Sequence, residues 1–274
     1  MHHQLFYKRL VKFYDLIYAN KNYEREARFV RDLVLKYKKS KGRDLLEVAC
    51  GTGRYLQYLR RWFQCFGVDK NPMMLKISRL NAPNVPTEQA DMITLKLNKK
   101  FDAIVCLFSS IGYVKNYANL EKTIRNFARH LKPGGVVIIE PWISKGKFIV
   151  GSPHLETFSG KDLKIARASV AKRRGDISII DFHFLIAERG KTVGHFADRH
   201  ELGMFDKNKV LKIMQHAGLK AKTVQSHFKS KRGLYVGVNP VRELARGIRL
   251  RARMGELHSA PPRRDGAFSN GVKK

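Results

Sequence analysis

The segment Asp44-Leu-Leu-Glu-Val-Ala-Cys-Gly-Thr-Gly53 gives the strongest indication of how this chain folds. A short apolar run that contains one acid ends in a Gly-x-Gly turn, and a segment with helical periodicity follows at residues 54–63. This order predicts a buried strand joined to a helix by a loop without side-chain bulk at Gly51 and Gly53. The backbone of such a loop can approach a ligand closely and direct its N–H groups toward it.

Two acids connect this loop with a ligand. Glu47 lies inside the apolar strand, where a carboxylate is costly unless it accepts hydrogen bonds from a neighbouring backbone or from a cationic or N–H-bearing ligand. A second predicted strand, Phe66-Gly-Val-Asp69, ends in a carboxylate that Lys70 follows, about 20 residues beyond the first turn. An acid at this place holds ribose hydroxyls in α/β nucleotide sites.

A third acid follows the next predicted strand, in the segment Ala90-Asp91-Met92. An acid beside an apolar residue can accept a hydrogen bond from an adenine amino group, while the backbone N–H meets a ring nitrogen. The third glycine of the dehydrogenase fingerprint is absent, and Glu47 precedes the turn. These features favour S-adenosylmethionine as the ligand, over another nucleotide or no ligand.

The composition indicates a cytoplasmic protein with a full hydrophobic core. The chain has 274 residues, of which 43% are hydrophobic. The three cysteines, Cys50, Cys65 and Cys106, show no CxxC spacing, and the histidines show no HxxxH spacing. Neither a disulfide framework nor a metal site is therefore expected. No run approaches 18 apolar residues and the first residues lack the apolar core of a signal peptide, so we expect no membrane span.

The net charge of +31 is unusually high. Residues 241–274 carry 9 basic and 3 acidic residues, so most of the excess lies in residues 1–240 and not in the tail. Such a field favours polyanionic partners: nucleic acid, an anionic membrane surface or a phosphorylated small substrate. A lysine-rich surface without a polyanionic partner explains the same number.

Strands alternate with helices along most of the chain, which predicts a parallel sheet with helices on both faces. Strands are expected at residues 44–49, 65–69, 87–90, 101–108, 136–141, 221–226 and 233–238. Helices are expected in residues 4–39 and at 54–63, 72–80, 117–131 and 206–217. Asp206 and Gly218 suit the two caps of the last helix. The turn Lys132-Pro-Gly-Gly135 is expected to separate the preceding helix from a strand.

The pattern changes after Trp142. Alternating runs at residues 163–171, 177–187 and 193–205 predict an antiparallel meander inserted into the α/β unit. The expected organisation is a helical cap at 1–40, a cofactor-binding core at 41–142, inserted strands at 143–205, completion of the core at 206–239 and a basic tail at 240–274. The tail has little apolar content, and disorder is the expectation there.

Several segments outside the glycine loop carry a resemblance to a known family. They are Phe13-Tyr-Asp15, Tyr23-Glu-Arg-Glu-Ala27, Cys106-Leu-Phe-Ser-Ser-Ile-Gly112, Phe127-Ala-Arg-His-Leu-Lys-Pro-Gly-Gly-Val-Val-Ile-Ile-Glu-Pro-Trp142 and Arg232-Gly-Leu-Tyr-Val-Gly237. Over roughly residues 4–239 the chain resembles class I S-adenosylmethionine-dependent methyltransferases. Within them it is most similar to the nucleotide-activated aminosugar N,N-dimethyltransferases, which finish sugars such as desosamine and mycaminose.

The resemblance implies a Rossmann-like class I sheet, an inserted antiparallel meander that roofs the acceptor, and a set of cofactor contacts. Tyr14 and Tyr23 would cap the site beside the methyl group. A histidine often follows Ser-Ser-Ile-Gly in these enzymes, and this chain has Tyr113 there. Residues from 240 onward have no counterpart. The resemblance assigns the methionine and ribose part of the cofactor to Glu47, Ala49, Gly51 and Gly53, the ribose to Asp69, the adenine to Asp91 and Met92, and the closing contact to Phe108.

An amine acceptor must lose its proton before it can accept a methyl group, so a base near the site would help. The candidates are Tyr14, Tyr113, His183, His200 and Glu201. Because His200 and Glu201 are neighbours on a strand, at most one of them faces the acceptor.

We expect a methyltransferase that acts on a small molecule, most of all on an amine nitrogen, with a nucleotide-linked amino sugar as the first acceptor to test. The alternatives are an RNA or ribosomal-component methyltransferase, which the charge suggests, and a cofactor-binding protein without catalysis. The sequence contains no basic RNA-binding module with interleaved aromatic residues, which counts against the RNA alternative. Members of the branch can form homodimers.

Overall fold

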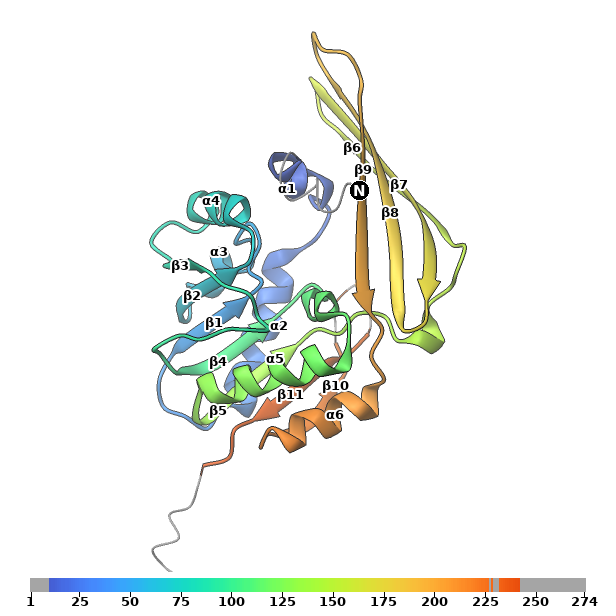
Figure 1. Ribbon diagram of the computed structural model, residues 1–274. Helices are drawn as coiled ribbons and strands as arrows, with labels where there is room; N and C mark the ends of the chain where they lie inside the picture. Colours follow the sequence, from blue (N-terminus) through green and yellow to red (C-terminus); the bar gives the residue numbers. More distant parts are fainter. Residues whose placement is uncertain (1–9, 227, 229–231, 242–274) are drawn as a thin grey trace, which may run out of the picture. The chain divides into compact units, whose positions relative to one another are not determined.

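The computed structural model describes residues 10–226, 228 and 232–241, and its centre is a seven-stranded sheet (Figure 1). The strand order is β10-β11-β5-β4-β1-β2-β3. All pairs are parallel except those of β11, which runs antiparallel to both β5 and β10. The strands are β1 (Asp44–Val48), β2 (Gln64–Asp69), β3 (Thr87–Gln89), β4 (Phe101–Cys106), β5 (Leu131–Ile139), β10 (Lys220–Val224) and β11 (Leu234–Val238).

Helices cover both faces of this sheet. Apolar residues of α2 (Tyr23–Tyr37), α3 (Leu56–Leu59) and α4 (Pro72–Asn81) pack against one face, and those of α5 (Tyr117–His130) and α6 (Lys207–His216) against the other. Strand β1 serves both cores, because alternate side chains point to opposite faces: Leu45 joins the first cluster and Leu46 the second. The expected class I α/β sheet is therefore confirmed.

A second, four-stranded antiparallel sheet follows β5 in the chain. Its order is β6-β7-β8-β9, with β6 at Pro153–Ser159, β7 at Leu163–Arg174, β8 at Ile177–Glu188 and β9 at Gly194–Gly203. One face buries apolar side chains against the N-terminal segment, where Leu10 and Phe13 meet Phe184. The other face is exposed. This arrangement of one covered and one open face is typical of antiparallel sheets.

From residue 10 onward, the N-terminal segment forms the 3-10 turn η1 (Val11–Phe13) and the one-turn helix α1 (Tyr14–Ile17) before α2, while the helical expectation for residues 4–9 lies outside the described residues. Asn22 caps α2 by accepting a hydrogen bond from the Arg25 N–H at 2.9 Å. None of the helices in the described residues is long and apolar enough to span a membrane.

Four expectations need correction. The meander has four strands and not three. The additional strand, β6, is almost wholly exposed, so its sequence lacks the alternating pattern by which a strand is recognised. The helix expected at 54–63 shortens to α3, and the strand expected at 136–141 begins at Leu131. There the pairing with β4 jumps from Leu131 to Val136, so the Pro-Gly-Gly segment is a bulge within one strand. The remaining helices and strands are confirmed to within a few residues, and the tail from residue 242 lies outside the described residues.

Candidate active site

The loop between β1 and α3 has a backbone conformation that only small residues adopt easily. Ala49, Gly51 and Gly53 all have positive φ, at 57°, 56° and 75°. A Cβ added to Gly51 would meet no atom within 4 Å, so this residue borders open space. A Cβ added to Gly53 would come within 2.4 Å of Ser78 Oγ, which shows how closely the loop approaches α4.

A pocket opens above this loop, with about 330 Å³ of empty space that includes open solvent at its mouth. Its walls come from the N-terminal cap, from β1 and its loop, and from the end of β4. The lining residues are Tyr14, Tyr23, Glu47, Ala49, Cys50, Gly51, Thr52, Arg54, Tyr55, Leu107, Phe108 and Ser110.

Glu47 is the polar anchor of this pocket. It is 2% exposed, and among the described residues its Oε2 has no hydrogen-bond partner. Burial raises the pKa of Glu47 well above the usual range, the nearby Asp69 raises it further, and the Leu56 backbone N–H opposes both. A buried carboxylate oxygen without a donor is costly, so this atom is suited to a ligand that supplies an N–H group or a cation.

Asp69, at the end of β2, connects the glycine loop to the next loop. Its Oδ2 accepts a hydrogen bond from the Gly51 N–H at 2.8 Å, and its Oδ1 accepts one from the Asn71 N–H at 2.8 Å. Burial raises the pKa of Asp69, and these backbone hydrogen bonds limit the shift. Asp69 therefore holds the loop beside the pocket in shape.

Lys70, Asp91 and Met92 lie at the neighbouring strand ends, outside the pocket lining. Lys70 Nζ donates to Asp91 Oδ2 at 2.9 Å, and Asp91 Oδ1 accepts from the Ile93 N–H at 2.9 Å. Met92 is half-buried against the core cluster of α5 and α6. These residues sit where the carboxyl ends of β2 and β3 meet, the edge at which open α/β sheets bind ligands.

The end of β4 is held in an unusual conformation. Phe108 and Ser109 both have positive φ, at 51° and 60°, which costs free energy and marks functional sites more often than ordinary turns. The Phe108 N–H donates to Glu140 Oε2 at 2.7 Å, and Arg232 Nη1 donates to Ser109 Oγ at 2.8 Å. Burial raises the pKa of Glu140, while the cations Lys21 and Arg232 lower it.

Asp15 fastens the N-terminal segment to the glycine loop after β1. Its Oδ1 accepts from Thr52 Oγ1 at 2.6 Å and its Oδ2 accepts from Asn81 Nδ2 at 2.8 Å. Asn81 also donates to the Thr52 carbonyl at 2.9 Å. This network places the neighbouring Tyr14 over the pocket.

Tyr14 belongs to a cluster of tyrosines. Burial raises the pKa of Tyr14 well above its usual value, and three neighbouring hydroxyls raise it further, those of Tyr18, Tyr23 and Tyr113. The Tyr14 and Tyr18 rings lie 4.9 Å apart, and Tyr18 meets the edge of Phe108 at 4.9 Å. The cluster spans the cap, the pocket and the 3-10 turn η2 (Ser110–Val114).

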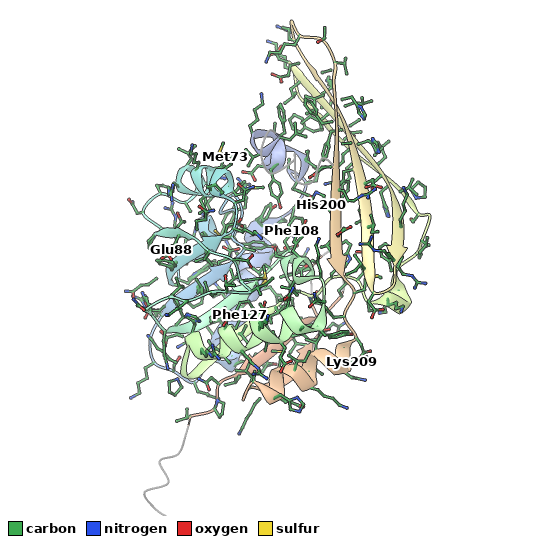
Figure 2. All side chains as sticks on the ribbon, in the orientation of Figure 1. Met73, Glu88, Phe108, Phe127, His200 and Lys209 are labelled. Carbon is green, nitrogen blue, oxygen red and sulfur yellow. The ribbon has the colours of Figure 1, made fainter. Side chains whose placement is uncertain are left out.

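A hydrogen-bonded chain continues from Tyr113 into the second sheet. Tyr113 Oη lies 2.6 Å from His200 Nδ1, and His200 Nε2 lies 2.9 Å from Asp198 Oδ2. His200 is 7% exposed and Asp198 is 2% exposed. In Figure 2, His200 lies on the side of β9 that faces Phe108 and the central sheet.

The structure does not bring His183 and Glu201 to this place. His183 is exposed on the outer face of β8 and stacks on His195. Glu201 binds Lys115 at 2.8 Å and Arg174 at 3.4 Å, on the face of β9 opposite to His200. Strand alternation explains both positions, because neighbouring residues on a strand point to opposite faces.

Sequence reasoning missed two contributors. Arg54 follows Gly53 directly, lines the pocket and has no partner for its Nε among the described residues. Asp198 stands two residues before His200 on β9. This spacing puts both on one face of a strand, so the pair was visible in the sequence once the strand was placed.

Residues 19–224 match the model of a methyltransferase domain. The chain belongs to this methyltransferase family. It is an S-adenosylmethionine-dependent methyltransferase of class I, and the use of S-adenosylmethionine is general in that family.

The resemblance to aminosugar N,N-dimethyltransferases is also confirmed. The chain is 36% identical over 228 residues to dTDP-3-amino-3,4,6-trideoxy-alpha-D-glucopyranose N,N-dimethyltransferase of Streptomyces venezuelae, covering 82% of this chain and 95% of the relative. It is 32% identical to dTDP-3-amino-3,6-dideoxy-alpha-D-glucopyranose N,N-dimethyltransferase of Streptomyces fradiae, covering 84% and 90%.

Solved structures give the same result. The crystal structure of Streptomyces venezuelae DesVI matches with a TM-score of 0.79 at 35% identity, covering 84% of this chain and 98% of that one. SAM-bound CalS10, an amino pentose methyltransferase from Micromonospora echinaspora, matches with a TM-score of 0.75 at 27% identity, covering 87% and 100%.

Proposed function

We propose that the pocket above the β1–α3 loop holds S-adenosylmethionine. The observation that carries this proposal is the buried Glu47 Oε2, which lacks a donor among the described residues and belongs to a residue that lines the pocket. The amino group of the methionine part supplies such a donor. Gly51, where no atom lies within 4 Å of a Cβ position, leaves room for close approach of the ligand.

We assign the remaining contacts by their places around the pocket. The side chain of Arg54 suits the methionine carboxylate, because guanidinium groups bind carboxylates well. Ala49, Gly53 and Asp69 shape the ribose site, Asp91 with Lys70 and Met92 forms the adenine end, and Tyr23 and Phe108 close over the ligand. Residues 1–40 act as the cap, and the inserted strands at 143–205 act as the roof of the acceptor site.

We propose a nucleotide-linked amino sugar as the acceptor, with its amine nitrogen as the atom that is methylated. Two relatives that are more than 30% identical and cover 82% and 84% of this chain are named as N,N-dimethyltransferases of dTDP-linked amino sugars. The net charge of +31 suits a diphosphate-bearing substrate. When bound, S-adenosylmethionine supplies a methyl group already activated as a sulfonium.

The chain's own residues then have to bind the acceptor, orient its amine toward the methyl group and exclude water. Proximity of the amine and the methyl group can lower the barrier by several kcal/mol. The cap contributes Tyr14 and Tyr18, and the covered face of the second sheet contributes Arg167 and Phe182. Arg167 Nη1 donates to Tyr18 Oη at 2.7 Å, and the Arg167 guanidinium lies 4.5 Å from the Phe182 ring centroid. These contacts join the N-terminal segment to the covered face of the second sheet.

Mass spectrometry of the acceptor tests the proposal. The purified full chain is incubated with S-adenosylmethionine and a panel of dTDP-linked amino sugars, in parallel with total RNA. We expect one or two added methyl groups on at least one amino sugar and none on RNA. Methylation of RNA alone would favour the nucleic-acid alternative, and transfer to neither would favour a binding protein without catalysis.

A further inference from the structure

The chain Tyr113–His200–Asp198 joins the acceptor side of the pocket to a buried carboxylate. Its two heavy-atom separations, 2.6 Å and 2.9 Å, are those of good hydrogen bonds. Asp198 as a carboxylate can only accept, so it faces the Nε2–H of His200 and leaves Nδ1 to accept from the Tyr113 hydroxyl. Each group is thereby oriented by the next one.

Tyr113 belongs to an element that borders the donor pocket. Ser110, in the same 3-10 turn, lines the donor pocket, and Tyr113 lies close to Tyr14, which also lines it. His200 itself is shielded by Phe182, whose ring meets it edge-on at 4.9 Å. Tyr113 therefore connects His200 with the space in front of the donor.

We propose that Tyr113, supported by His200 and Asp198, removes the proton from the acceptor ammonium. This proposal rests on the proposed function, since it needs an amine acceptor in front of Tyr113. Tyr113 is the catalytic residue, because it touches the acceptor. His200 and Asp198 act through it.

The proton transfer balances without any further reactant. The acceptor nitrogen loses one proton to Tyr113 Oη, while the original hydroxyl proton of Tyr113 moves to His200 Nδ1. The product is a neutral amine with a free electron pair and an imidazolium paired with the Asp198 carboxylate. The imidazolium later returns its proton through Tyr113 to water. Each methyl transfer leaves a protonated alkylamine, so a dimethylating enzyme needs this step before each transfer.

The groups around the chain are compatible with this role. On β9, the Asp198 carboxylate contacts the His200 ring, with Oδ2 at 2.9 Å from Nε2. From β8, Phe182 contributes an uncharged ring, and from α1 Tyr14 contributes a hydroxyl that interacts with Tyr113. Arg167 of β7 is occupied by Tyr18 and Glu156. Lys115 and Glu201 pair with each other away from the ring.

The pH profile of single-turnover methyl transfer distinguishes this relay from a structural role. Tyr113→Phe and His200→Gln should each lose about 100-fold in rate below the pKa of the acceptor amine. The loss should shrink as the pH rises above that pKa, because the amine then arrives unprotonated. His195→Gln, an exposed histidine on the same strand, should match the wild type. A loss of the same size at every pH would overturn the proposal.

Nitrogen NMR of the imidazole rings tests the relay without turnover, on the full chain. We expect the neutral His200 ring to carry its proton on Nε2, and Tyr113→Phe to change the Nδ1 signal of His200 while the His195 signal stays unchanged. A His200 that carries its proton on Nδ1 would contradict the relay. If the wild type methylates no amino sugar at any pH, the proposed function fails, but this spectrum still decides the arrangement of the relay. Asp198→Asn, which should change the tautomer of His200, serves as the second variant.

Discussion

Two glycines of this chain have almost the same backbone conformation but different surroundings. Gly51 in the cofactor loop has φ +56° and Gly175 in the β7–β8 turn has φ +59°, and a Cβ on either would meet no atom within 4 Å. Alanine at either position should therefore cost about 1–2 kcal/mol of stability, because a left-handed conformation disfavours a Cβ. Only Gly51→Ala should also weaken donor binding, since its methyl group enters the pocket.

Thermal unfolding and calorimetric titration with S-adenosylhomocysteine check this prediction on the two variants. Equal losses of stability with a loss of binding in Gly51→Ala alone would support the placement of the ligand. If both variants bound S-adenosylhomocysteine equally well, the β1–α3 loop would be excluded as the binding site of the ligand.

Glu47 predicts a pH dependence of stability in the free protein. Burial raises the pKa of this carboxyl, so the folded state holds its proton to a higher pH than the unfolded state, whose pKa is about 4.3. The contribution of Glu47 to the free energy of unfolding is therefore lost as the pH rises from that value toward the raised pKa. Glu47→Gln should remove this part of the dependence, so that the wild type loses more stability than the variant as the pH rises above the unfolded-state pKa.

The same variant should bind the donor about tenfold to hundredfold more weakly, because a hydrogen bond to a charged group contributes about 1.5–3 kcal/mol. Glu88→Gln, an exposed residue of β3, is the control and should change neither property. Denaturation curves at several pH values and calorimetry provide the two measurements. Parallel pH curves for the wild type and Glu47→Gln would refute the assigned ionisation.

At the scale of single residues, the sequence predicted which side chains have a chemical role better than it predicted where those side chains point. Glu47 and Gly51 stood out because an acid inside an apolar strand and a Gly-x-Gly turn both have direct physical consequences. The roles considered for His183 and Glu201 depended on which face of a strand meets the pocket. That choice depends on the packing of the second sheet against the N-terminal segment, which no local pattern encodes.

At the scale of elements, the short helix α1 is held in place by one carboxylate. Asp15→Asn should remove at least one of its two hydrogen bonds, to Thr52 and Asn81, because an amide offers one acceptor oxygen where the carboxylate offers two. Amide hydrogens of residues 13–19 should then exchange about tenfold faster, and donor affinity should fall. Hydrogen exchange measured by mass spectrometry checks this result.

Asp32→Asn is the matched control, since Asp32 is an exposed residue of α2 that pairs only with its neighbour Arg31 among the described ion pairs. It should leave exchange in residues 13–19 unchanged. If Asp15→Asn behaved in the same way, the cap would be held by its apolar contacts alone.

The elements themselves were largely predictable, because alternation and helical periodicity report burial. The exceptions are instructive. β6 is exposed along nearly its whole length and is formed by pairing with β7, so its pattern carries no signal. α3 ends after one turn although the periodicity continues, because the chain turns at residues 60–63 to enter β2. In both cases tertiary contacts decide what local propensity does not.

At the scale of the whole molecule, the outer face of the second sheet exposes Leu155, Val170 and Leu185, at 67%, 47% and 51%. Exposed apolar side chains gathered on one face are typical of an interaction surface. We therefore propose that the chain forms a homodimer through this face, and we expect Leu185→Lys to shift the protein toward the monomer in sedimentation equilibrium. Leu80→Lys, at a 79% exposed position on α4, is the control. A wild type that sediments as a monomer would contradict the prediction.

The central claim concerns the donor, and calorimetric titration of the full chain with S-adenosylhomocysteine and S-adenosylmethionine tests it most directly. The account predicts that both bind at a single site, with a negative change in heat capacity from the buried apolar surface, and that Glu47→Gln weakens both. Absence of any binding heat for either compound, at several temperatures and with a folded protein, would contradict it.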